Sequence, residues 1–223
     1  MNAELNNLRI IDIETVSISS SFEIPIENLR QHWERKAIQL CSEDEKLTSD
    51  LYFGRRTIYD ELEKIIIISV GISYEFEGET LLNITFFQNC DEAKLLNGFK
   101  KLFGIKFNRQ QLKLCIHNGK EFYFPFLCWC MIVNGGVIPQ TLDLSGKKPW
   151  EVQHVPTDLW KFGDKKNYTP LDLLAPLFYI DSSKLNIDGS QVNKVYYNEN
   201  TDSKQLMNYC QGVVIGIDQV YLN

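Results

Sequence analysis

The stretch Ile11–Thr15, which reads IDIET, ends an apolar run that also contains Leu8 and Ile10. Such a run is typical of a buried strand, and side chains two residues apart leave the same face of a strand. Asp12 and Glu14 therefore share one face, where two carboxylates are costly unless a positive charge pairs with them. Mg²⁺ or Mn²⁺ is the natural partner, because hard cations prefer oxygen ligands. The alternative is a half-exposed edge strand that carries two solvated acids.

Composition limits the class of protein. The chain has 223 residues, 44% of them hydrophobic, which is enough for one sizeable core. Its 23 basic and 29 acidic residues give a net charge of −6. A general nucleic-acid coat protein would be basic, so broad binding to polyanions is not expected. This charge remains compatible with an enzyme that has a local basic groove around a metal site.

Neither a signal peptide nor a membrane span is expected. Residues 1–7 are polar, and the longest apolar run, Ile65–Ile72, is far too short to cross a bilayer. We expect a cytoplasmic protein whose cysteines are mostly buried free thiols in a reducing compartment: Cys41, Cys90, Cys115, Cys128, Cys130 and Cys210. The spacing of Cys128 and Cys130 does not predict a zinc knuckle.

Hydrophobic periodicity predicts an α/β fold, in which a mixed sheet is covered by helices on both sides. Strands are expected at 8–13, 64–74, 80–88, 112–116 and 138–144, with a turn at Glu77 and Gly78 between the second and the third. Helices are expected at 27–40, from a cap at Asp91 to 103, and at 122–133, 170–177 and 204–222.

Three sequence stretches together suggest a family. They are Ile11–Val16 (IDIETV), His117–Leu127 (HNGKEFYFPFL) and Tyr209–Val214 (YCQGVV). They resemble the three motifs of the predicted 3′–5′ exonucleases of the DEDDy type, which are related to the proofreading exonuclease domain of B-type DNA polymerases. Three further stretches resemble this group, so that the resemblance covers nearly the whole chain: Gly146–Glu151, Asp158–Gly163 and Ile187–Ser190.

The resemblance implies an α/β fold of the ribonuclease H-like superfamily, with a mixed five-stranded sheet between two helical layers in a single domain over residues 1–223. It implies metal-dependent hydrolysis at the 3′ ends of single-stranded DNA or RNA, with Mg²⁺ or Mn²⁺ as the cofactor. Asp12 and Glu14 are the implied metal ligands and catalytic carboxylates. Tyr209 is implied to orient the attacking water. The alternative for Tyr209 is a buried tyrosine at a helix–sheet contact.

The chain departs from the family pattern at two metal ligands, because Tyr123 and Val213 stand where the family has aspartates. Two divalent ions carry four positive charges, which Asp12 and Glu14 alone balance poorly. A phenol is neutral near pH 7 and is a poor ligand for a hard cation. We therefore expect that hydrolysis is weak or lost, and that the site holds one ion or none.

Few other acids can replace the missing aspartates. Asp218 is five residues beyond Val213, about 140° further around the helix, so it should point elsewhere. Glu121 is two residues before Tyr123 and should point away as well. Asp143 and Asp172 remain candidates. Val213 itself belongs to an inward stripe of the last helix: Leu206, Tyr209, Val213, Ile217 and Val220.

The substrate-binding residues follow from the second motif. Asn118 is implied to contact the substrate, and Phe122 to stack on a terminal base. The alternatives are a loop that caps the next helix, which we favour for His117, and core packing for Phe122. Aromatic and basic residues alternate after the predicted fifth strand, forming either a nucleic-acid contact surface or a loop pinned by its own aromatics: Lys147, Lys148, Trp150, Trp160, Lys161, Phe162, Lys165 and Lys166.

Three functions therefore fit the sequence. The first is a weak 3′–5′ exonuclease, and the second is a binder of single-stranded DNA or RNA ends that has lost the chemistry. The third is a scaffold for protein contacts, which the net charge of −6 mildly favours. No membrane partner is expected, and the sequence leaves DNA versus RNA and the oligomeric state open.

Overall fold

A computed structural model describes residue 5 and residues 7–20, 27–40, 62–103, 112–117, 123–148, 151–152, 154–156, 170–180, 187, 189–198 and 203–222. Within these ranges, no helix combines the length and the apolar character needed to cross a membrane.

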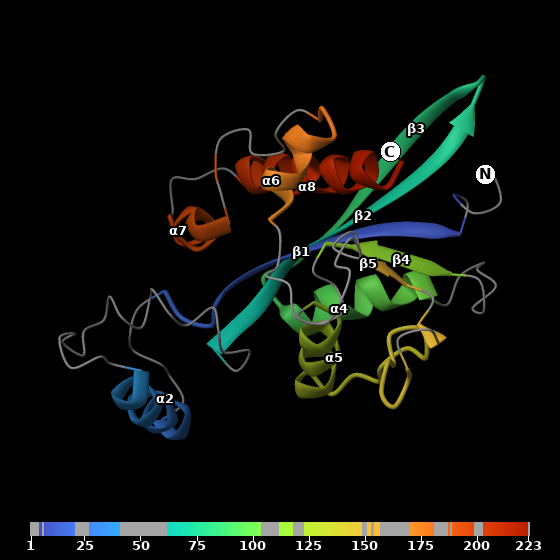
Figure 1. Cartoon of the computed structure of the whole chain (residues 1–223). Helices are drawn as coiled ribbons and strands as arrows, with labels where there is room; N and C mark the ends of the chain where they lie inside the picture. Colours follow the sequence, from blue (N-terminus) through green and yellow to red (C-terminus); the bar gives the residue numbers. More distant parts are fainter. Residues whose placement is uncertain are drawn as a thin grey trace.

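A mixed sheet runs through the middle of the molecule (Figure 1). Its strands are β1 (Leu8–Ser17), β2 (Glu63–Phe76), β3 (Glu79–Gln88), β4 (Lys113–Ile116) and β5 (Val155–Pro156), in the spatial order β3-β2-β1-β4-β5. The pairs β1–β2 and β2–β3 are antiparallel, whereas β1–β4 and β4–β5 are parallel. Four strands form the body of the sheet, because β5 contributes only two residues at one edge.

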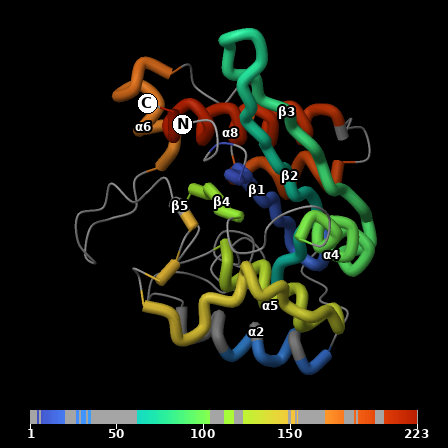
Figure 2. The backbone as a smooth tube through the Cα atoms, turned by 90° about the vertical axis from the view of Figure 1, so that its right-hand side faces the viewer, coloured from blue at the N-terminus to red at the C-terminus, as the bar shows by residue number. Residues whose placement is uncertain are grey.

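Helices cover both faces of this sheet (Figure 1, Figure 2). On one face lie α4 (Glu92–Lys100), its 3-10 extension η3 (Lys101–Phe103) and α5 (Phe124–Val133). The other face carries α6 (Leu171–Leu177), the turn η7 (Gly189–Gln191), α7 (Val192–Tyr197) and α8 (Ser203–Leu222). The chain is therefore α/β with a mixed sheet between helices. The further helix α2 (Glu27–Leu40) follows β1 in the sequence.

Local sequence signals explain several element ends. Asp91 caps α4, since its carboxylate accepts a hydrogen bond from the backbone N–H of Lys94 at 3.2 Å. Glu77 and Gly78 have φ angles of 52° and 85°, the left-handed pair that a tight turn between β2 and β3 requires. Gly135, with φ of 69°, ends α5 after the C-cap Asn134. The cap at Asp91, the turn at Glu77 and Gly78 and the end of the helix at residue 133 agree with the predictions from sequence.

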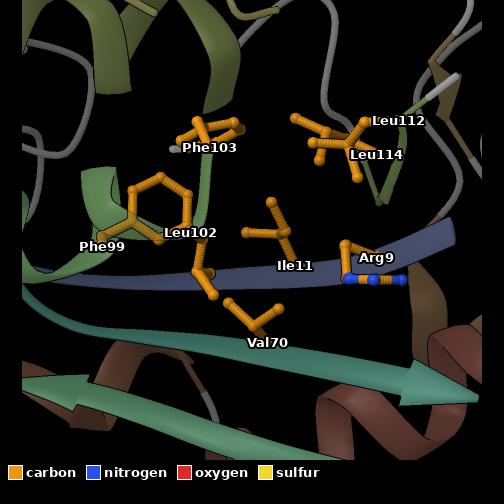
Figure 3. Close-up of a pocket in the computed structure, with 8 residues that line it drawn as sticks. All are labelled: Arg9, Ile11, Val70, Phe99, Leu102, Phe103, Leu112 and Leu114. Carbon is orange, nitrogen blue, oxygen red and sulfur yellow. The ribbon is translucent and has the colours of Figure 1, made fainter. Parts of the chain in front are cut away.

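The first of the two β1 faces is apolar at its centre, at Ile11 and Ile13. Ile11 and Ile13 pack in one core with residues of α4 and α5. Phe99 of α4 is fully buried there, and its ring meets Phe87 and Phe103 edge-on at centroid distances of 5.8 and 5.2 Å. Figure 3 shows a small cavity at this face, lined by seven apolar side chains and one cation: Ile11, Val70, Phe99, Leu102, Phe103, Leu112, Leu114 and Arg9.

The opposite face of β1 is covered by α8. Leu8 and Ile10 pack against Val214, Ile217 and Val220 of that helix. Further along the strand, Val16 packs in a second cluster that includes Leu206 and Cys210. Asp12 and Glu14 lie on the strand between these two apolar contacts.

Gly71 of β2 allows α8 to lie close to the sheet. A Cβ atom at this position would lie 2.7 Å from Cγ1 of Val214 and 3.1 Å from Cδ1 of Leu82. Both distances are shorter than ordinary van der Waals contact. The absence of a side chain at Gly71 therefore sets how near α8 sits to β1 and β2.

The sequence prediction of a strand at 138–144 is wrong. The backbone N–H groups of Leu142 and Asp143 both donate to the carbonyl of Pro139, at 2.9 and 3.2 Å, so this segment turns on itself. The place beside β4 is taken instead by the two residues of β5. Among the described residues, the sheet therefore has four full strands and the short β5. The remaining predicted strands and helices are confirmed with ends shifted by up to four residues, where the structure describes them.

The cysteines are free, as expected, among the described residues. Cys115, Cys130 and Cys210 are buried and Cys128 is half-buried. Cys90 is exposed, because it lies between β3 and α4 rather than in the core, so that the described cysteines are mostly but not all buried. Cys41 lies outside the described residues.

Candidate functional site

Asp12 and Glu14 leave the α8 side of β1 as the period of two requires. Asp12 is only 4% exposed and lies opposite Ser69 of β2 in the strand register. Glu14 lies opposite Ile67, whereas the next residue, Thr15, lies opposite Ile65, so a bulge falls directly after Glu14. A bulge increases the local twist and can turn a side chain toward a new direction. In this protein the bulge directly follows Glu14, the second residue of the acidic pair.

A half-open pocket of about 170 Å³ contains this acidic pair. Its walls come from β1, from the ends of β4, α5 and α6, and from η7 and α8: Asp12, Glu14, His117, Tyr123, Pro170, Leu171, Asp172, Gly189, Tyr209 and Val213. The volume is enough for several water molecules or a small polar group.

The structure thus brings together residues from all three sequence motifs. Tyr123 precedes α5, and Tyr209 and Val213 are one helical turn apart on α8. Tyr209 is 9% exposed, and its hydroxyl oxygen lies 3.5 Å from where a Cβ of Gly189 would stand. Asn118 and Phe122, the predicted substrate contacts, lie outside the described residues.

Two of the pocket walls lack the carboxylates that the family pattern would place there. Tyr123 offers a phenol and Val213 a methyl pair. Of the candidate substitutes, Asp172 lines the pocket from α6. Asp143 is exposed elsewhere and accepts hydrogen bonds from the backbone N–H and hydroxyl of Ser145 at 3.0 and 2.5 Å.

Asp218 points away from the pocket, as the helical spacing predicts. Its carboxylate accepts a hydrogen bond of 2.5 Å from the hydroxyl of Ser73 on β2, in a buried contact between α8 and the sheet. Glu121 lies outside the described residues. Asp172 is therefore the one candidate substitute, among those in the described part of the chain, that reaches the pocket.

The electrostatics of the acidic pair are unfavourable without a cation. Burial raises the pKa of Asp12 to about 7. Burial also raises the pKa of Glu14, and the charges of Asp12 and Glu63 raise it further. Because two buried negative charges repel each other, binding of a proton by the pair is favoured over two charged carboxylates. A bound cation would replace that proton and favour the charged forms.

A third possible ligand was missed from the sequence. The sulfur of Cys210 and one carboxylate oxygen each of Asp12 and Glu14 all lie within 4.8 Å of one another. This group could hold a metal ion. Cys210 is fully buried on α8. It lies four residues from both Leu206 and Val214, and this spacing could have placed it on the face of the helix that packs against the sheet.

The predicted basic and aromatic contact surface is described only in part. Lys147 and Lys148 are exposed beside the turn at Gly146. The backbone N–H of Lys148 donates to Glu151 at 2.7 Å, which orders this end of the segment. Its other predicted members, Trp150 and the five residues between 160 and 166, lie outside the described residues.

No protein-family model matches the chain, and no curated protein matches it.

Proposed function

We propose that this chain is a ribonuclease H-like protein of the DEDDy exonuclease type, which binds 3′ ends of single-stranded DNA or RNA and hydrolyses them weakly or not at all. One observation carries the proposal. Asp12 and Glu14 share a pocket with Tyr123, Tyr209 and Val213, although these residues come from three distant parts of the chain. The mixed sheet between helical layers also fits the proposed superfamily.

The residues of the pocket suggest a division of roles. Asp12 and Glu14 would hold the divalent ion, which when bound stabilises charge at the phosphorus and helps to generate hydroxide. Tyr209 presents its hydroxyl beside the backbone of Gly189, where it can orient a water or a phosphate oxygen. Asp172 also lines the pocket and can accept a proton or a hydrogen bond there.

A binder without turnover is the second candidate, and Tyr123 and Val213 favour it. Both occupy the pocket wall without supplying an anionic ligand, so a second ion close to the first would meet uncompensated repulsion. Loss of one ion is expected to reduce the rate on the order of a thousandfold or more. Binding of a 3′ end at this pocket would not require that second ion.

The test is hydrolysis of a single-stranded oligonucleotide labelled at its retained end, with Mn²⁺, together with binding measured at several salt concentrations. We expect salt-sensitive binding by the wild type with little cleavage, and a rise on the order of a thousandfold in the Tyr123→Asp/Val213→Asp double variant. Asp12→Ala in that background should abolish cleavage. The matched control is Asp143→Ala, which removes an exposed carboxylate that does not line the pocket.

Two results would change the proposal. Absence of both binding and cleavage in the wild type and in the folded double variant would refute it. Strong cleavage by the wild type that disappears in Asp12→Ala would mean that another group completes the site, and Asp172→Asn would then be the next variant.

A further inference from the structure

The donor atoms around Asp12 and Glu14 do not fit a pair of magnesium ions. Mg²⁺ demands near-octahedral oxygen coordination. Among the described residues, the acidic cluster with metal-binding spacing contains two carboxylates and one thiol, from Asp12, Glu14 and Cys210. Asp172 lines the pocket but does not belong to that close group. The third donor is therefore sulfur, where the family pattern would call for oxygen.

Asp12 provides separate evidence that the pocket is made for a cation. Its side chain is 4% exposed, and its Oδ2 atom has no hydrogen-bond partner among the described residues. Leaving a buried carboxylate oxygen unsatisfied costs more than leaving a neutral group unsatisfied. This oxygen belongs to a residue that lines the pocket, so an ion entering from the pocket can reach it.

The distances suit one ion held by all three side chains. Metal–oxygen and metal–sulfur bonds of about 2.1 and 2.3 Å place tetrahedral ligand atoms about 3.6 Å apart. The three donor atoms already lie within 4.8 Å of one another, so small side-chain rotations would close the site. Three protein ligands leave a fourth tetrahedral position that the protein does not fill, which is the arrangement of a reactive rather than a structural zinc site.

We infer that Asp12, Glu14 and Cys210 form a single site for a thiophilic divalent ion of the zinc class. A thiolate selects Zn²⁺, Co²⁺ or Cd²⁺ over Mg²⁺, because soft ligands favour soft or borderline metals. The three ligands carry three negative charges against the two of the ion, so no second ion is required for near-neutrality. The inference shares Asp12 and Glu14 with the proposed function but not its nucleic-acid substrate, so the two can fail separately.

Cobalt titration of the purified full chain tests the inference without any nucleic acid. We expect one equivalent of Co²⁺ to give a sulfur-to-cobalt charge-transfer band, which Zn²⁺ abolishes and a large excess of Mg²⁺ does not. Cys210→Ser should remove the band and weaken Zn²⁺ binding at least about a hundredfold. Cys115→Ser is the matched control, since Cys115 is equally buried but lies on β4 outside the donor group.

Cadmium NMR of the wild type needs no variant, so it tests for a sulfur ligand even if Cys210→Ser does not fold. One sulfur ligand moves the cadmium resonance far from the all-oxygen range, and we expect that displacement. An all-oxygen resonance, a cobalt band that survives in Cys210→Ser, or competition by Mg²⁺ would each overturn the inference. Cleavage that depends on Mn²⁺ without any sulfur–metal band would overturn the inference and leave the proposed function standing.

Discussion

The two faces of β1 are built from alternate residues of one strand, yet they meet opposite demands. On the α4 and α5 side, Ile11 and Ile13 join a continuous apolar core. On the α8 side, Asp12 and Glu14 interrupt the apolar contacts of Ile10 and Val16. Burial of apolar side chains on the first face stabilises the fold, whereas desolvation of two carboxylates on the second face destabilises it. The apolar face thus provides the stability that an electrostatically costly pocket requires.

The largest expected effect comes from breaking the apolar face. Phe99→Ala should lower the free energy of unfolding by about 3–5 kcal/mol, because a fully buried ring leaves a cavity against Phe87 and Phe103. Chemical denaturation monitored by circular dichroism measures it. Phe76→Ala is the control, since Phe76 is 56% exposed at the end of β2 and should change stability little. Equal losses in the two variants would contradict this account of the core.

On the acidic face, a substitution is expected to raise the free energy of unfolding rather than to lower it. The pKa of Asp12 rises from 3.8 to about 7 on folding, so the folded state binds the proton more tightly than the unfolded chain. The stability linked to this group is present below about pH 4 and is lost as the pH rises toward about 7. Asp12→Asn cannot ionise and should therefore stabilise the metal-free protein near pH 8, on the order of 3 kcal/mol.

Denaturation curves with a chelator at pH 4 and pH 8 measure this difference, which should nearly vanish at the lower pH. Asp143→Asn serves as the control, because hydrogen bonds from Ser145 lower the pKa of that exposed carboxylate and its loss should not stabilise the fold. A gain for Asp12→Asn that is the same at both pH values would rule out ionisation as its cause.

A side chain added between the sheet and α8 should lower the stability of the protein. Gly71→Ala places a methyl group 2.7 Å from Val214, so α8 or β2 must move, at a cost of about 1–3 kcal/mol. Gly189→Ala is the matched control, because its new methyl group would meet the Tyr209 hydroxyl at an ordinary 3.5 Å. Thermal unfolding of both variants checks the difference. A Gly71→Ala protein as stable as Gly189→Ala would show that α8 is not closely seated on β2.

The smallest change in stability is expected at the N-terminus of α4, the helix that packs on the apolar face. Asp91→Ala removes the side-chain acceptor for the N–H of Lys94 at the start of α4 and should cost about 1 kcal/mol. Asp91→Asn retains an acceptor and should lose less. The free energies of unfolding of the two variants measure the cap, and an Asn variant as weak as the Ala variant would place the effect in charge rather than in capping.

Much of the fold was predictable because its signals are local. The alternation in β1, the cap at Asp91 and the turn at Glu77 and Gly78 each depend on neighbours within a few residues. The strand expected at 138–144 failed because its apolar residues resemble a short strand, while the backbone hydrogen bonds to Pro139 form a turn. Short apolar runs do not distinguish the two.

The candidate site was predictable in part. The spacing of Asp12 and Glu14 and the inward face of α8 give two of its walls, and helical geometry correctly turned Asp218 away toward Ser73. Asp172 remained one candidate among several, because its position depends on where α6 packs. Cys210 was missed as a ligand, since a single cysteine in an apolar helix is usually a core residue.

The sequence by itself determined the alternation that puts two carboxylates on one face of β1, because side-chain direction in a strand follows from the backbone alone. It also determined that Tyr123 and Val213 bring no negative charge. Only the tertiary structure decided which donor completes the acidic pair. The approach of α8 over Gly71 brings the Cys210 sulfur within 4.8 Å of both carboxylates, and contacts across such sequence distances are fixed by packing rather than by local pattern.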